Sequence, residues 1–180
     1  DNHASLIDGA QHAQAKIQRY RHLNFEHLAQ ILQDSQESAW VVTERVFSMD
    51  GAIASVNSIQ SLIADKHHLI IDDSHGIGVL PVIQENSRQN LVYTAGLGKA
   101  FGVMGGIVAG SSQIIEVCTQ FARTGIYSTA LPPAVAAAAC ASLSIIQSSE
   151  GDDLREKLNH NINYFKSLCD ECNIQLLPSQ

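Results

Sequence analysis

The chain has 180 residues, 45% of them hydrophobic, which is enough for one sizeable core, and a single domain is the default expectation. Its formal net charge is -7, from 11 basic and 18 acidic residues, and the basic residues are scattered, which argues against a nucleic-acid or anionic-membrane surface. No apolar run approaches the roughly 20 residues that span a bilayer, so we expect no membrane-embedded segment.

Short apolar runs alternate with helical patterns along most of the chain. The apolar runs predict buried strands at residues 39–42, 69–71, 91–93 and 106–109. The helical patterns predict helices at residues 4–16, 25–33, 58–66 and 113–121. Strands that alternate with helices favour βαβ units and a parallel or mixed sheet.

The last third of the chain has a different character. Pro132 and Pro133 open an alanine-rich helix that is predicted to run through Ile146, with proline in the first turn, where its missing N–H does no harm. This helix is apolar but too short to span a bilayer, so we expect it to be buried. Asp152 can cap a further helix that runs to about Cys172.

The four cysteines indicate a reducing compartment. Cys169 and Cys172 have the spacing of a redox or zinc motif, but Cys118 and Cys140 do not form the second close pair that a zinc ribbon needs. Free thiols and the lack of a signal peptide predict a cytoplasmic location. The chain begins at Asp1 without an initiator methionine, which suggests a fragment or a processed chain.

Polar residues follow three of the predicted strands. They are found at residues 43–44 with 48–51, at 72–75 and at 94–102. Because ligands of open α/β sheets bind beyond the carboxyl ends of the strands, we expect these residues to converge on one edge of the sheet.

The stretch LIIDDSHG ends a buried strand on two carboxylates. Alternation along the strand sends Asp72 and Asp73 to opposite faces, so the two predict different roles. With His67, His68 and His75 they form a dense set of possible metal ligands, but the first two histidines lie at the other end of the strand, which disfavours a single metal site. A structural alternative is that Asp73 and the serine after it cap a turn and that His75 is a surface residue.

The glycine-rich stretch at residues 94–106 surrounds one lysine, Lys99. It is not a P-loop, because Tyr93 and Ala100 occupy the places of the required Gly and Ser/Thr. It is not a dinucleotide fingerprint, because Phe101 follows where Gly or Ala is expected. Its small and apolar neighbours favour a desolvated, nucleophilic lysine over a solvated loop lysine.

A lysine nucleophile and an aspartate at a strand end are the two protein groups that pyridoxal phosphate (PLP) requires. The lysine binds the cofactor covalently, and the carboxylate keeps the pyridine nitrogen protonated, so that the ring accepts electrons. Lys99 and Asp72 therefore predict PLP as the cofactor.

Five stretches carry a family resemblance: NHAS (2–5), VVTERVFSMDG (41–51), IIDDSHGIGV (70–79), GLGKAFG (96–102) and YSTALPPA (127–134). Together they resemble the α-oxoamine synthases, a branch of the fold-type I PLP enzymes, over nearly the whole chain. The resemblance implies a three-layer α/β/α fold with a mainly parallel sheet, like the large domain of these enzymes.

The resemblance covers only the middle of such an enzyme. Residues 1–150 would be part of the PLP-binding large domain, and residues 151–180 would be a helix and a strand that lead to a C-terminal small domain. The phosphate-binding glycine-rich loop and the small domain with its substrate-binding arginine would lie outside this sequence, so we expect these 180 residues alone to be inactive.

The resemblance also implies roles for single residues. Lys99 would bind the cofactor and move protons at the substrate Cα, and Asp72 would pair with the pyridine nitrogen. His75 and Ser48 would bond the ring hydroxyl, and His3 would stack on the ring. No metal is expected.

The residues that would bind the cofactor phosphate depart from the family pattern. The family usually has threonine three residues before the lysine, where this chain has Gly96, and Thr94 is the nearest candidate substitute. Ser128 and Thr129 would reach the phosphate of a partner subunit's cofactor, which implies a homodimer with sites at the interface.

The implied reaction is a decarboxylative condensation of L-alanine with a pimeloyl thioester of CoA or a carrier protein, in biotin synthesis. The stretches VVTERVFSMDG, YSTALPPA and SSEGDDLREKL favour these substrates. Members that use another amino acid or acyl group share Lys99 and Asp72, so they remain alternatives. A non-catalytic fragment or paralogue is a further alternative.

Overall fold

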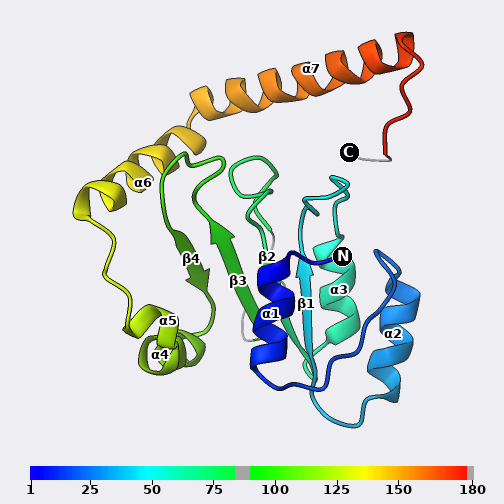
Figure 1. Ribbon diagram of the computed structural model, residues 1–180, viewed down its shortest axis with the longest axis vertical. Coiled ribbons are helices and arrows are strands. Elements are labelled where there is room, and N and C mark those ends of the chain that lie inside the picture. The colour runs from blue at the N-terminus through cyan, green and yellow to red at the C-terminus, as the bar shows by residue number, and fades with distance from the viewer. Residues whose placement is uncertain (84–89, 178–180) are drawn as a thin grey trace.

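A four-stranded sheet forms the centre of the computed structural model, which describes residues 1–83 and 90–177. The strand order is β1-β2-β3-β4 (Figure 1), with β1 at Trp40–Glu44, β2 at His68–Asp72, β3 at Leu91–Gly96 and β4 at Gly106–Ala109. The first three strands are parallel, and β4 runs antiparallel to β3. The predicted α/β class with a mainly parallel sheet is therefore confirmed.

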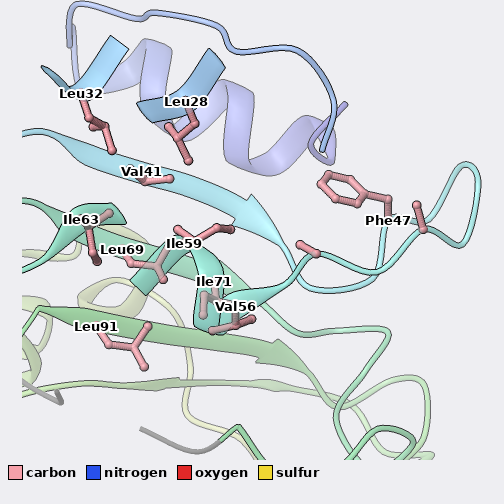
Figure 2. Close-up of a cluster of buried hydrophobic side chains, with 12 residues drawn as sticks. Leu28, Leu32, Val41, Phe47, Val56, Ile59, Ile63, Leu69, Ile71 and Leu91 are labelled. Atoms are coloured by element: carbon pink, nitrogen blue, oxygen red, sulfur yellow. The ribbon is translucent and has the colours of Figure 1, made fainter. Parts of the chain in front are cut away.

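Two helices cover one face of this sheet. The helices α2 (Phe25–Asp34) and α3 (Val56–Ile63) pack their apolar sides on alternate residues of the strands. Burial of each Leu or Ile side chain contributes about 1.5–3 kcal/mol relative to leaving it exposed. Figure 2 shows this core, which includes Leu28, Leu32, Val41, Ile59, Ile63, Leu69, Ile71 and Leu91.

The other face of the sheet is thinly covered in the described part of the chain. The helix α1 (Ala4–His12) has no buried residue, and the segment before it is attached to β1 by a hydrogen bond from Asn2 Nδ2 to the Val42 carbonyl (2.8 Å). The helix ends earlier than the predicted residue 16, because the chain turns at Gln14, whose φ of 53° is left-handed. The helices on one face of the sheet are thus well packed, whereas α1 lies on the other face and buries none of its residues.

Helices follow β4 to the end of the described chain, and Figure 1 shows the last two extending away from the sheet. The expectation that the alanine-rich helix is buried is wrong for the described chain, since no residue of it is buried. Its side chains find no covering element there, although Ser142 Oγ donates to the Phe101 carbonyl (2.7 Å). These helices are α4 (Ser112–Phe121), α5 (Arg123–Ile126), α6 (Pro133–Ile146) and α7 (Ser149–Glu171).

The helix α7 begins a little before the predicted Asp152 and ends close to Cys172. The strand that was expected after it is absent from residues 172–177, and residues 178–180 lie outside the described part. None of the helices in the described ranges has both the length and the hydrophobicity to cross a bilayer.

Candidate active site

The carboxyl ends of the three parallel strands bring polar side chains together. In the strand register Glu44 pairs with Asp72, and Asp72 pairs with Thr94. Because side chains alternate along a strand, all three lie on the face opposite the α2–α3 core. The edge that the sequence predicted as a ligand crevice therefore carries two adjacent carboxylates and a hydroxyl.

Asp72 and Asp73 point to opposite faces, as the alternation predicts. Asp73 is 1% exposed, and its Oδ2 accepts hydrogen bonds from Arg45 Nη1 (3.0 Å) and the Tyr93 hydroxyl (2.7 Å). Burial raises the pKa of Asp73, and the bonds from Tyr93 and Arg45 act against this rise. Asp73 thus holds the loop after β2 on the core side, which leaves Asp72 for the open side.

Asp72 has one oxygen engaged and one available. Its Oδ1 accepts hydrogen bonds from the backbone N–H of Ser74 (2.9 Å) and from the Ser74 hydroxyl (2.5 Å). No hydrogen bond from the described residues engages Oδ2. An anionic oxygen held in this way can accept a proton donor from a ligand on the open face of the sheet.

His75 lies within electrostatic reach of the other predicted groups. Its partial burial and the positive charge of Lys99 lower the pKa of His75, with a small further lowering by His3, while Glu44 and Asp72 oppose these effects. The electrostatic environment of His75 therefore includes His3, Asp72 and Lys99.

The turn between β3 and β4 carries Lys99. Backbone hydrogen bonds from Leu97 N to Gly105 O (2.9 Å) and from Gly102 N to Lys99 O (3.0 Å) close it. Leu97 and Phe101 are buried beneath the turn, but Lys99 itself is exposed. The expected desolvation of the lysine by these neighbours is therefore wrong for the described chain, since they anchor the turn and leave the amine open to solvent.

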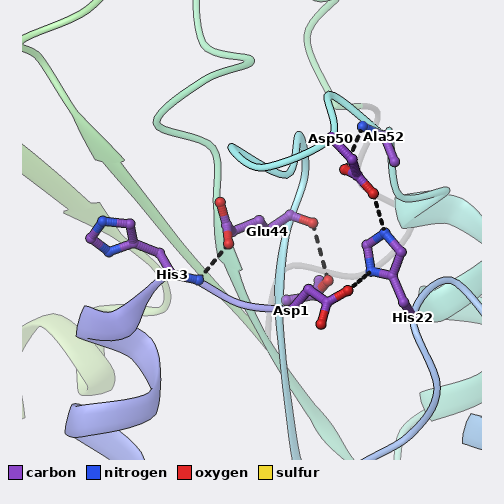
Figure 3. A network of polar contacts seen from close by, with 7 residues as sticks. Asp1, His3, His22, Glu44, Asp50 and Ala52 are labelled. Carbon is purple, nitrogen blue, oxygen red and sulfur yellow. Dashed lines mark hydrogen bonds and ion pairs between the residues drawn. The ribbon is translucent and has the colours of Figure 1, made fainter. Parts of the chain in front are cut away.

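His3 is held in place through its backbone. Its N–H donates to Glu44 Oε1 (2.5 Å), as Figure 3 shows. Its ring Nδ1 lies 2.9 Å from Ser5 Oγ at the start of α1. Glu44 is 3% exposed and so is fixed by its surroundings. Sequence reasoning did not give Glu44 a role, although its position at the end of β1, beside Asp72, was a signal that it belongs to the site.

Ser48 lies in an exposed turn that directly follows β1. Asp50 braces this turn by accepting a hydrogen bond from Ala52 N (2.9 Å) and by contacting His22 Nε2 through its other oxygen (2.9 Å), as Figure 3 shows. The hydrogen bond from Ala52 N–H lowers the pKa of Asp50. The contacts of Asp50 therefore stabilise the turn in which Ser48 lies.

The remaining predicted residues are less directly connected to this place. Thr94 lies beside Asp72, and its hydroxyl donates to the Ile71 carbonyl (3.2 Å). Ser128 and Thr129 follow α5 and are exposed; the Ser128 hydroxyl donates to the Thr124 carbonyl. Within the described ranges neither residue hydrogen-bonds with the groups around Asp72.

In the described residues, no group of three or more His, Cys, Asp or Glu side chains is arranged to hold a metal ion. The candidate ligands separate because His67 is buried at the start of β2 (4% exposed), whereas Asp72 and His75 are at its far end.

Comparison with known proteins matches residues 2–180 to the family "Aminotransferase class I and II". The chain is 43% identical over 194 aligned residues to the 8-amino-7-oxononanoate synthase of Saccharophagus degradans, which covers 99% of this chain and 47% of that protein. It is 45% identical over 175 aligned residues to the enzyme of the same name from Hahella chejuensis, which covers 92% of this chain and 44% of that protein. The chain thus spans about half the length of the curated relatives it matches.

Solved structures show the same likeness in three dimensions. The crystal structure of 8-amino-7-oxononanoate synthase from Francisella tularensis superposes with a TM-score of 0.77 at 34% identity, over 99% of this chain and 53% of that chain. A structure of SPT with PLP superposes with a TM-score of 0.77 at 28% identity, over 89% of this chain and 42% of that chain.

Proposed function

Because the chain belongs to the aminotransferase class I and II family, we propose that it supplies the central cofactor-binding residues of a PLP-dependent 8-amino-7-oxononanoate synthase. The proposed reaction joins L-alanine to the acyl carbon of a pimeloyl thioester and releases CO2 and the free thiol of CoA or of a carrier protein. The product, 8-amino-7-oxononanoate, belongs to biotin synthesis.

One observation carries this proposal. His75, at the carboxyl edge of the sheet, is within electrostatic reach of Lys99, Asp72 and His3. These are the groups that a PLP enzyme needs for covalent attachment, for the pyridine nitrogen and for the ring faces. The similarity to proteins named 8-amino-7-oxononanoate synthase supports the choice of substrates.

The donor set fits the cofactor. Asp72 presents a free carboxylate oxygen on the open face, where it would hold a proton on the pyridine nitrogen, and its other oxygen is fixed by two donors. When bound, PLP withdraws electrons from the Cα of the amino acid, which makes the Cα proton removable. The Lys99 amine would hold the cofactor and later take up that proton.

The other groups would orient the reactants. His75, whose lowered pKa keeps its ring neutral near pH 7, would offer a hydrogen bond to the ring hydroxyl together with Ser48. His3, fixed by Glu44, would lie over the ring face. Thr94 would contribute a hydroxyl toward the phosphate side.

We propose a homodimer in which Ser128 and Thr129 serve the partner's cofactor. Both residues are exposed, and in the described chain neither hydrogen-bonds with the groups around Asp72. A cytoplasmic location also belongs to this proposal and fits the four cysteines, all of which are free thiols.

The test begins with the cofactor. PLP added to the protein in its natural form should produce a visible absorbance band that Lys99→Ala removes and that Lys157→Ala, an exposed lysine of helix α7, leaves unchanged. A band that persists in Lys99→Ala would refute the assignment of the lysine.

The substrate is tested with L-alanine, glycine and L-serine, each offered with pimeloyl-CoA and with pimeloyl-carrier protein. Mass spectrometry should detect 8-amino-7-oxononanoate with L-alanine and no comparable product with the other two. Turnover of glycine or serine in place of alanine would instead support a sibling enzyme.

A sibling α-oxoamine synthase is the second candidate: 2-amino-3-ketobutyrate CoA ligase, 5-aminolevulinate synthase or serine palmitoyltransferase. The superposition on SPT favours this group, since the two chains share the fold over 89% of this chain. A non-catalytic fragment or paralogue would show no product with any amino acid and no band that depends on Lys99.

A further inference from the structure

Ser74 connects two places that the sequence treats separately. Its hydroxyl donates to Asp72 Oδ1 (2.5 Å) and accepts a hydrogen bond from the backbone N–H of Gly96 on β3 (2.8 Å). Its own N–H donates to the same Asp72 oxygen (2.9 Å). The hydroxyl therefore bridges the end of β2 to the end of β3, and its bond to the carboxylate is of the short, charge-assisted kind.

This arrangement fixes the plane of the Asp72 carboxylate. Two donors from one residue hold Oδ1, so rotation of the Asp72 carboxylate would break both bonds. Hydrogen bonds to a charged group are stronger than those between neutral groups, so the two together favour one orientation of the carboxylate. The free oxygen is thereby kept on the side where a ligand would meet it.

The same hydroxyl explains why residue 96 is glycine. The backbone φ of Gly96 lies outside the left-handed range, so a side chain is permitted by the backbone. A Cβ there would lie 3.3 Å from Ser74 Oγ and 3.8 Å from Ser74 Cβ. The first contact is tight, and a shift of the hydroxyl by a few tenths of an ångström would strain its bonds to Asp72 and to Gly96.

We propose that Ser74 is a positioning residue that orients Asp72 for the cofactor, and that its hydroxyl disfavours a side chain at position 96. Ser74 and Gly96 form a matched pair: the serine hydroxyl occupies the space that a side chain at position 96 would need. The part of this inference that concerns the cofactor rests on the proposed function, whereas the contact between the two residues does not.

The contact is tested by a double-mutant cycle on the cofactor-free protein in its natural form, with Tm as the readout. Gly96→Ala should lower Tm by about 2–4 °C in the parent, and it should leave Tm unchanged or raise it when combined with Ser74→Ala. Gly98→Ala is the matched control, because a Cβ there meets nothing within 4 Å and its effect should not depend on residue 74. Equal losses from Gly96→Ala in both backgrounds would overturn the pairing.

The positioning role is tested by titration with PLP, followed by absorbance. Ser74→Ala should weaken PLP binding about tenfold and shift the pH at which the bound cofactor's absorbance changes, because the Asp72 carboxylate loses its orientation. Ser74→Thr, which keeps the hydroxyl, should restore both readouts, and Ser61→Ala on the exposed side of α3 should change neither.

The two possible failures are distinguishable. If the parent binds PLP and Ser74→Ala changes neither the affinity nor the pH dependence, the positioning role is overturned and the proposed function stands. If the parent shows no band that depends on Lys99, the proposed function and the positioning role both fall, and the cycle with Gly96 still decides whether the contact exists.

Discussion

At the scale of single residues, the site depends on the alternation of side chains at the end of β2. Asp73 turns to the core, where Arg45 and Tyr93 bind it, and Asp72 turns to the open face. The neighbouring carboxylates therefore have separate surroundings, and the chemical role that we propose belongs to Asp72 alone. The two aspartates also provide a natural pair of variants, because each can be changed without altering the charge of the other.

Asp72→Asn should leave PLP bound but reduce turnover by on the order of 10²–10³-fold, because the amide cannot keep the pyridine nitrogen protonated. Absorbance after PLP addition reports binding, and product formation from L-alanine and pimeloyl-CoA reports turnover. The neighbouring Asp73→Asn should instead lower Tm, because it weakens the buried contacts with Arg45 and Tyr93. A rate near that of the parent in Asp72→Asn would contradict the proposed cofactor geometry.

His75 should titrate below its ordinary pKa of 6.5 in the folded, cofactor-free protein, because of its burial and then Lys99. The unfolded chain then binds the proton at a higher pH than the folded chain does. The stabilising contribution of the neutral ring is present above pH 6.5 and is lost as the pH falls toward the folded pKa.

An NMR titration of the His75 ring checks this directly. Lys99→Ala should raise the midpoint, because it removes the largest positive charge acting on the ring, and Lys157→Ala on α7 should leave the midpoint where it is. A midpoint at or above 6.5 in the parent would show that the ring is not shielded as the structure indicates.

At the scale of helices and strands, the sequence predicted where elements occur better than what covers them. All four strands were located, because short apolar runs bounded by polar residues have few other interpretations. Of the site residues named by motif, Asp72 and Lys99 both contribute to the electrostatic environment of His75, and their roles stay predictions. Glu44 and Ser74 belong to stretches that were expected at this edge, but neither was given a role of its own, because the bonds from His3 N to Glu44 and from Gly96 N to Ser74 join segments far apart in the chain.

The errors concern burial. The apolar composition of α6 suggested a buried helix, and the apolar neighbours of Lys99 suggested a desolvated amine. An apolar composition indicates that burial of a segment is favourable, but whether the segment is buried depends on other elements that pack against it. In the described chain no element covers α6 well enough to bury any of its residues. At Lys99 the apolar neighbours Leu97 and Phe101 are buried themselves and leave the amine exposed.

The chain bends sharply between α6 and α7, and adding one Cβ atom at Gly151 tests how tightly this bend is packed. A Cβ at Gly151 would lie 2.5 Å from the Ile145 carbonyl oxygen and 2.6 Å from the Ile146 carbonyl oxygen, and these backbone atoms cannot move aside. Arg155 Nη1 also donates to the Ile146 carbonyl at this bend (3.0 Å).

Gly151→Ala should therefore destabilise the protein by about 1–3 kcal/mol, measured as a lower Tm or urea midpoint. Gly9→Ala in α1 is the matched control, since a Cβ there meets nothing within 4 Å and alanine is the better helix former by up to about 1 kcal/mol. Equal effects of the two substitutions would show that the bend tolerates a side chain.

At the scale of the whole molecule, the described chain is packed on one side of its sheet and open on the other. The α2–α3 face holds the continuous core, while β4, α6 and the turn with Lys99 are exposed. Large apolar side chains are uncovered around the site as well, including Met49 (80% exposed) and Met104 (70% exposed). Such surface is typical of a protein whose remaining contacts come from further chain or from a second copy.

The 180 residues on their own should be catalytically inactive with L-alanine and pimeloyl-CoA, and they should bind a hydrophobic dye strongly because this surface is uncovered. A form of the protein as long as its relatives should bind less dye per chain and should turn over. Robust product formation by the 180 residues alone would contradict the view that the site needs more protein than this chain holds.

The antiparallel return of β4 also affects the order in which the site assembles. The turn with Lys99 closes through hydrogen bonds between near neighbours in the chain, and hairpins form in about 1–10 μs. Asp72 meets Glu44 and Thr94 through parallel pairings that must first close long loops, which is a slower event. We therefore expect the turn with Lys99 to form early and the pairings of Asp72 with Glu44 and Thr94 to form late, which places completion of the cofactor site in the last stage of folding.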